Sequence, residues 1–284
     1  MFLLLYHRSK KLICFFTVNS TFYFSLITLI SFVFIFSACI GISSKLSLFT
    51  GELAKPFPVI TIGHPVFDEL GKKWISSSYF DRSMQYKNSR LEVVSFSDLL
   101  DKYETAQVFD AILLNCFDDY QGIILVDDIR RYDLQLATNI ALAHGSDSPS
   151  WLQPLLLVVP DSKNPPFLER FLTANINELQ FVRLADYYAP LDKENMPETN
   201  AGLGRVVFKN NCLFCHSINS VGGNKGGSLL EKFNFQLDKE KRRFKKKFLL
   251  THGQFNASKQ NTNQFLAEKD LDNLSMFLSA LINR

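Results

Sequence analysis

The feature that most constrains this chain is the stretch of residues 212–216, Cys-Leu-Phe-Cys-His. Two cysteines separated by two residues and followed directly by a histidine are typical of covalent haem attachment. In that chemistry each thiol adds across one vinyl group of the porphyrin, and the histidine becomes the proximal iron ligand. We expect a helix to place the Cys212 and Cys215 thiols on one face, with His216 beside them. The pattern therefore predicts one covalently bound haem c.

Two other uses of the cysteine pair, besides a chance match, are open from the pattern alone. Half of a zinc site would need two more cysteine or histidine ligands at similar spacing. Only His252 follows His216, and no further cysteine does. A thioredoxin-like redox pair would follow a strand and would not require the histidine. We therefore favour haem over both.

The residues on either side of the motif resemble the cytochrome c family. The run Gly-Arg-Val-Val-Phe-Lys-Asn-Asn starts at Gly204 and leads into Cys212. Two glycine pairs follow the histidine, at residues 222–223 and 226–227, and the second pair continues into Ser228-Leu229. The family has a glycine and an apolar-Phe pair before its haem cysteines, and a Gly-Pro-x-Leu turn after them.

This resemblance covers about residues 197–284 and implies an all-α cytochrome c domain over residues 201–284. It implies that Gly204 lets the first helix of the domain cross the last one closely. It also implies that the carbonyl of Gly227, which stands where the family has proline, accepts the N–H of the His216 imidazole. Such a bond fixes the tautomer of a ligating histidine and raises its basicity.

The distal ligand of the iron is open. The family's distal methionine stands in a Met-Pro-x-Phe segment, and the matching residues 262–265, Thr-Asn-Gln-Phe, contain none. Met276 falls opposite the apolar face of the last helix, so we expect it to point to solvent. His252 is a candidate distal ligand, and a His/His pair would have a lower potential than Met/His. The alternatives are water, Lys259 or no ligand.

The N-terminus has the pattern of an export signal. Arg8, Lys10 and Lys11 precede residues 22–38, which carry no charged side chain. Residues 1–39 are therefore predicted to be a signal peptide or membrane anchor, followed by a tether over residues 40–57. The segment Phe-Ser-Ala-Cys ending at Cys39 resembles a bacterial lipoprotein box, which implies a lipid on that cysteine; the alternative is an uncleaved anchor. Both place the body of the protein on the periplasmic side, where bacteria attach haem covalently.

Residues 58–190 are predicted to form an α+β or mostly β domain. Apolar and β-branched runs predict strands at residues 59–62, 91–96, 109–116, 123–126, 155–159 and 177–184. A short capped helix is expected at residues 97–103, and residues 127–143 are expected to be helical in part. Cys116, inside an apolar run, is expected to be a small buried hydrophobic residue.

This order of elements resembles the sulfite-oxidase-type molybdopterin domain. The resemblance depends on the segments Phe-Ser-Asp-Leu-Leu at residues 96–100, Cys-Phe-Asp-Asp-Tyr at 116–120 and Leu-Leu-Leu-Val-Val-Pro at 155–160. The family's metal-ligating cysteine lies upstream of these, and this chain has no cysteine between Cys39 and Cys116. We therefore expect no molybdopterin, and we interpret residues 118–120 as a turn.

The fold class predicted from the whole sequence is thus two domains. An α+β or mostly β domain of degenerate sulfite-oxidase-like fold is followed, after a linker at residues 191–200, by an all-α cytochrome c domain. Lysines and arginines concentrate between Lys239 and Lys247, which is either a docking face for an acidic redox partner or a solvated helix face. The formal net charge of +3 gives no reason to expect nucleic acid.

These expectations favour a periplasm-facing, membrane-attached, single-haem electron carrier over a catalyst. One alternative is a haem enzyme or gas sensor with an open iron site. The other is the haem-bearing part of a molybdenum oxidoreductase. The distal ligand separates the carrier from the enzyme or sensor, and molybdenum content separates it from the oxidoreductase.

Overall fold

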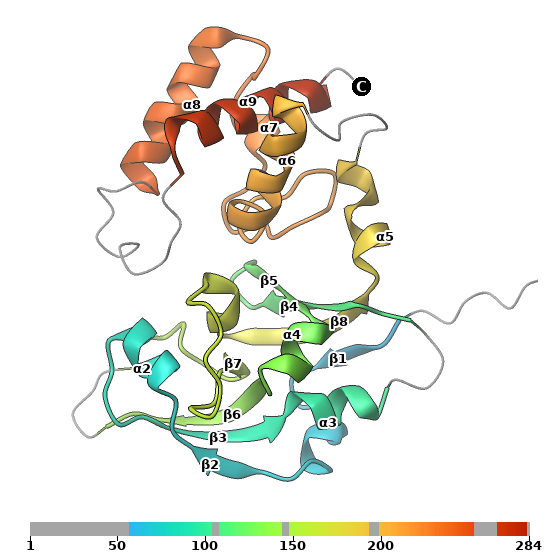
Figure 1. The fold of residues 1–284 in the computed structure, drawn as a ribbon, viewed down its shortest axis with the longest axis vertical. Coiled ribbons are helices and arrows are strands. Elements are labelled where there is room, and N and C mark those ends of the chain that lie inside the picture. The colour runs from blue at the N-terminus through green and yellow to red at the C-terminus, as the bar shows by residue number, and fades with distance from the viewer. Residues whose placement is uncertain (1–56, 104–107, 144–147, 193–198, 253–265, 283–284) are drawn as a thin grey trace, which may run out of the picture. The chain divides into compact units, whose positions relative to one another are not determined.

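The computed structural model describes residues 57–103, 108–143, 148–192, 199–252 and 266–282 (Figure 1). The chain divides into two units, Met1–Pro56 and Phe57–Arg284. The predicted signal or anchor, the Cys39 lipid site and the tether up to Pro56 lie outside the described residues. Lys259 and residues 262–265 also lie outside them.

The first antiparallel sheet has the strand order β1-β8-β4-β5. Its strands are β1 (Val59–Thr61), β8 (Ile176–Val182), β4 (Ala111–Cys116) and β5 (Gln121–Leu125). Side chains alternate between the two faces of a strand. Along β4, Ile112 and Leu114 pack into one hydrophobic cluster, whereas Ala111 and Leu113 pack into another. Both faces of the sheet are therefore covered at β4.

The second antiparallel sheet has the order β2-β3-β6-β7. Its strands are β2 (Lys73–Ile75), β3 (Arg90–Ser95), β6 (Gln135–Ala141) and β7 (Leu156–Val158). The expectation of partial helix over residues 127–143 holds only for α4 (Val126–Arg131). Residues Gln135–Ala141 are instead the strand β6, because their backbone pairs with β3 on one side and β7 on the other.

Short helices lie between these strands and after β8. They are α2 (Ser78–Met84), α3 (Phe96–Asp101), α4 and α5 (Leu184–Tyr188), with 3-10 helices at Pro65–Asp68, Glu169–Leu172 and Ala189–Leu191. The hydroxyl of Ser95 accepts the N–H of Asp98 at 3.1 Å and so caps α3. Cys116 ends β4 and lies in the same hydrophobic cluster as Ile112 and Leu114, as predicted.

The C-terminal part of the described chain is helical. It contains α6 (Asn200–Asn211), α7 (Leu229–Lys232), α8 (Asp238–Thr251) and α9 (Glu268–Ile282). Helices α6 and α9 cross at Gly204, where a Cβ atom would lie 1.9 Å from the carbonyl oxygen of Asn273. On α9 the predicted apolar face is buried, and Met276 is 49% exposed, as expected.

The fold class predicted from the sequence is wrong. Phe57–Arg284 is a single unit of mixed α/β fold with two antiparallel sheets, and it does not end in a clear all-α cytochrome c domain. One hydrophobic cluster explains the difference, since strand residues share it with helix residues: Ala111, Leu113, Ile123 and Val182 from the sheet, and Phe208, Leu213, Phe277 and Leu278 from the helical part. The helices pack their apolar side chains against one face of the first sheet. The apolar patterns of the strands and of the helices therefore do not belong to two separate cores.

Candidate haem-binding site

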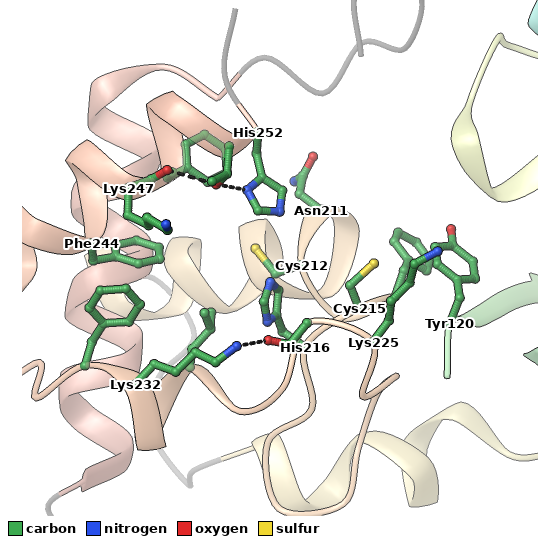
Figure 2. Close-up of a pocket in the computed structure, with 16 residues that line it drawn as sticks. Tyr120, Asn211, Cys212, Cys215, His216, Lys225, Lys232, Phe244, Lys247 and His252 are labelled. Atoms are coloured by element: carbon green, nitrogen blue, oxygen red, sulfur yellow. Dashed lines mark hydrogen bonds between the residues drawn. The ribbon is translucent and has the colours of Figure 1, made fainter. Parts of the chain in front are cut away.

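The Cys212–His216 motif lies in the turn that follows α6, not within a helix as predicted. Helix α6 ends at Asn211, and the N–H of Cys212 still donates to the carbonyl of Phe208 at 2.9 Å. Beyond it, the N–H groups of Cys215 and His216 both donate to the Cys212 carbonyl, at 3.1 and 2.9 Å. This tight turn brings all three side chains to one cavity (Figure 2).

The cavity has a volume of about 610 Å³, within the range of ligand and cofactor pockets. Its walls are mainly apolar and come from the motif, α7 and α8: Phe214, Leu229, Phe233, Phe244 and Phe248. Lys225, Lys232 and Lys247 also line it. An apolar pocket that contains several cations suits a flat apolar ligand that carries negative charge.

The His216 imidazole is held by the glycine-rich turn that follows it. Its Nδ1 donates to the carbonyl of Gly227 at 2.7 Å, so the predicted hydrogen bond is present. Because a carbonyl can only accept, Nδ1 carries the proton and the lone pair is on Nε2. Burial lowers the pKa of His216, although the bond to Gly227 opposes this shift. The neutral imidazole that results is the form that ligates a metal.

Gly226 makes this arrangement sterically possible. A Cβ atom there would lie 2.2 Å from Cε1 and 2.5 Å from Nδ1 of His216. The N–H of Gly226 donates to the Cys215 carbonyl at 2.6 Å, which anchors the turn beneath the imidazole. Gly227 has a φ of 66°, a left-handed conformation that glycine adopts at no steric cost.

Both cysteines of the motif carry reduced thiols. Cys212 is buried, and desolvation raises the pKa of its thiol to about 12. The protonated thiol is therefore its form at neutral pH, and a thiol is what adds across a vinyl group. Cys116 is separate from this pair. It lies in the hydrophobic cluster of Ile112 and Leu114, and burial raises the pKa of its thiol to about 12.

The β4–β5 turn packs against the Cys212–His216 motif, and this contact was not predicted from the sequence. The predicted turn at residues 118–120 is present, and Asp119 has a φ of 61°. Its neighbour Tyr120 stacks on Phe214 with ring centroids 5.8 Å apart and planes inclined by 13°. The N–H of Gln121 donates to the Phe214 carbonyl at 2.9 Å. Residues distant in sequence thus hold the peptide between the two cysteines.

The same turn binds the loop after His216. The carbonyl of Asp119 accepts the N–H of Asn224 at 2.8 Å, and the Asp118 carboxylate pairs with Lys225 at 2.5 Å. This ion pair raises the pKa of Lys225. In the sequence, only the unusual Asp-Asp pair in a turn position could have signalled this contact.

His252 lies at the end of α8 and contributes its ring to the same cavity (Figure 2). The centroids of the His252 and His216 rings are 6.1 Å apart, with planes inclined by 51°. Met276, in contrast, is not among the residues that line the cavity. The structure therefore brings four of the predicted side chains together, namely Cys212, Cys215, His216 and His252.

Comparison with known proteins finds no family model and no curated protein that matches this chain. Within the ranges that the structure describes, no helix is long and apolar enough to cross a membrane. The same ranges contain no cluster of three or more histidine, cysteine, aspartate or glutamate side chains arranged to bind a metal ion. The function therefore has to be inferred from the site itself.

Proposed function

We propose that this protein binds one haem c covalently through Cys212 and Cys215, with His216 as the proximal iron ligand, and that it carries electrons. The observation that supports this most is the convergence of two reduced thiols and one imidazole on a single cavity. The imidazole has the tautomer required of a ligand, since its Nδ1–H is used by Gly227.

The lining of the cavity fits haem. A porphyrin is a flat apolar ring with two carboxylate groups, and it would lie against Phe233, Phe244 and Phe248. Lys247 is exposed and lines the cavity, so it can neutralise a carboxylate. Lys232 donates to the Gly226 carbonyl and also lines the cavity.

When bound, haem iron supplies a one-electron change between its ferrous and ferric states. The chain's own residues hold and tune it. The Gly227 carbonyl makes the His216 imidazole a stronger base, and the phenylalanine side chains would give a bound haem mainly apolar walls. A carrier needs this combination of fixed ligands and an apolar pocket more than it needs acid–base groups.

The proposal also includes the cellular location of the protein. The basic residues before the apolar run at 22–38 favour export, with attachment to the membrane through Cys39 or an uncleaved anchor. Covalent haem attachment in the bacterial periplasm agrees with that direction. We keep the prediction that molybdopterin is absent, because no cysteine lies between Cys39 and Cys116.

Haem staining after denaturing electrophoresis tests the proposal. The full chain should keep its stain, because thioether bonds survive denaturation, and Cys212→Ser with Cys215→Ser should abolish it. Cys116→Ala is the matched control and should stain like the unchanged protein. Metal analysis should find about one iron per chain, as one motif implies, and background molybdenum. Haem that acid acetone extracts from the unchanged protein would contradict covalent attachment, and stoichiometric molybdenum would favour an oxidoreductase.

A further inference from the structure

His252 faces His216 across the cavity, with the two ring centroids 6.1 Å apart. A metal–imidazole bond is about 2 Å long, and a ligating nitrogen lies about 1 Å from the centre of its ring. Two such bonds to one metal atom therefore separate the ring centres by roughly 6 Å. The observed separation of 6.1 Å matches this value.

The hydrogen bonds of Thr251 determine the tautomer of His252. The Thr251 hydroxyl donates to the Lys247 carbonyl at 2.8 Å, and its oxygen lies 2.6 Å from Nδ1 of His252 (Figure 2). Because a carbonyl only accepts, the hydroxyl proton is used there, and Nδ1 of His252 must be the donor to Thr251. The lone pair of His252 is then on Nε2, as in His216.

The orientation of the His252 ring is also fixed by packing. It stacks on Phe248, one helical turn earlier on α8, with centroids 5.5 Å apart and planes inclined by 7°. Phe248 itself lines the cavity. His252 is exposed, yet its ring is stacked and its Nδ1 is hydrogen-bonded, which a surface histidine without a role would not need.

We propose that Nε2 of His252 is the distal iron ligand, opposite His216, and that Thr251 is its positioning residue. This inference rests on the proposed function, since it needs haem bound at Cys212 and Cys215. Two imidazole ligands close the iron to gases and to substrates. They also give a lower potential than a His/Met pair, because methionine ligation raises the potential. The site is thereby assigned to electron transfer, not to an enzyme or sensor with open iron.

Optical and electron paramagnetic resonance spectra of the purified full chain test this ligand. The unchanged protein should be low-spin in both oxidation states. His252→Ala should keep its haem stain but become high-spin, bind carbon monoxide when reduced, and return to low-spin when imidazole is added. His64→Ala is the matched control, because His64 caps a 3-10 helix and does not line the cavity. It should leave the spectrum unchanged.

Thr251 variants separate positioning from folding. Thr251→Val keeps the shape of the side chain but removes the acceptor for Nδ1, and should weaken distal ligation about 10-fold or more. This would appear as a high-spin fraction and a shifted midpoint potential. Thr251→Ser restores the hydroxyl and should restore both readings.

Two results would overturn the inference while leaving the proposed function intact. One is an unchanged low-spin spectrum in His252→Ala. The other is the near-infrared charge-transfer band of His/Met haem in the unchanged protein. In both cases the haem stain persists. A protein without covalent haem would instead fail the staining test and defeat both proposals.

Discussion

Gly226 is a residue at which the site leaves no room for a side chain. Its Cα lies so close to the His216 ring that a Cβ atom would come within 2.2 Å of Cε1. Gly226→Ala should therefore displace the imidazole and break its bond to Gly227. We expect haem to remain on the cysteines but a fraction of the iron to lose its His216 ligand, which the optical spectrum would report.

Gly71→Ala is the control for this residue, because nothing lies within 4 Å of a Cβ atom built there. It should leave the spectrum and the haem content as they are. A Gly226→Ala protein with an unchanged spectrum would mean that the His216 ring does not occupy this position when haem is bound.

Among the elements, the crossing of α6 and α9 depends on Gly204. A Cβ atom at this position would lie 1.9 Å from the Asn273 carbonyl oxygen and 2.9 Å from the N atom of Leu274. Both are backbone atoms, so the helices would have to separate. We expect Gly204→Ala to lower the free energy of unfolding by about 1–3 kcal/mol, as overpacked cores do, measured by denaturant titration.

Val206, on the same helix and 50% exposed, provides the comparison. Val206→Ala should change stability by no more than about 0.5 kcal/mol, as surface substitutions do. Equal effects of the two substitutions would show that α6 does not approach α9 as closely as the structure has it.

Helix α8 carries the basic residues for which the sequence left two interpretations open, a docking face for a redox partner or a solvated helix face. Within the described part of the chain, Lys241, Arg243 and Lys245 form ion pairs with Asp238, Glu240 and Asp272. Lys239, Arg242 and Lys246 are exposed and form no ion pair with a described residue. These last three, at i, i+3 and i+7, share one face of the helix and leave it positively charged.

Charge reversal tests this face. Lys239→Glu, Arg242→Glu and Lys246→Glu together should slow oxidation of the reduced protein by hexacyanoferrate, an anion, several-fold at low salt. The difference should vanish at high salt, where charges are screened. The same reversal of Lys73 and Arg90 on the second sheet and of Lys87 in the loop before β3 is the control. If that control slows the reaction equally, net charge and not α8 determines the rate.

At the scale of the whole molecule, a chain of polar side chains joins the first sheet to the site. Glu178 accepts from Asn115 at 2.7 Å, Asn115 accepts from Gln121 at 2.8 Å, and Gln121 accepts from the hydroxyl of Tyr187. That hydroxyl in turn accepts the N–H of Gly222 at 2.8 Å. Desolvation raises the pKa of Tyr187, so its hydroxyl stays protonated and can donate.

Tyr187→Phe should therefore lower the free energy of unfolding by about 1 kcal/mol, because it leaves two partly buried partners, Gln121 and Gly222, without this bond. Thermal or denaturant unfolding would measure it. Tyr188→Phe is the matched control, since its hydroxyl forms no hydrogen bond with a described residue. A Tyr187→Phe protein as stable as the control would mean that the network contributes little.

Local patterns predicted much of the site. The spacing of Cys212, Cys215 and His216, and the glycines at 226 and 227, act within a few residues of one another, so the sequence contains them directly. The buried face of α9 and the exposure of Met276 follow from helical periodicity. The helix expected at the cysteine pair was wrong, because the chain turns at Cys212 to form the bond between His216 and Gly227.

Contacts between distant segments were decided by the tertiary structure alone. An apolar strand such as β4 shows that its residues will be buried, but not what covers each face, so Ala111 and Leu113 gave no sign of packing with the helices. For the same reason the sequence predicted two domains, whereas Phe57–Arg284 is one compact unit. The position of His252 opposite His216, and the Asp118 turn against Lys225, likewise depend on packing between elements, because hydrophobic burial has no direction that a single segment can encode.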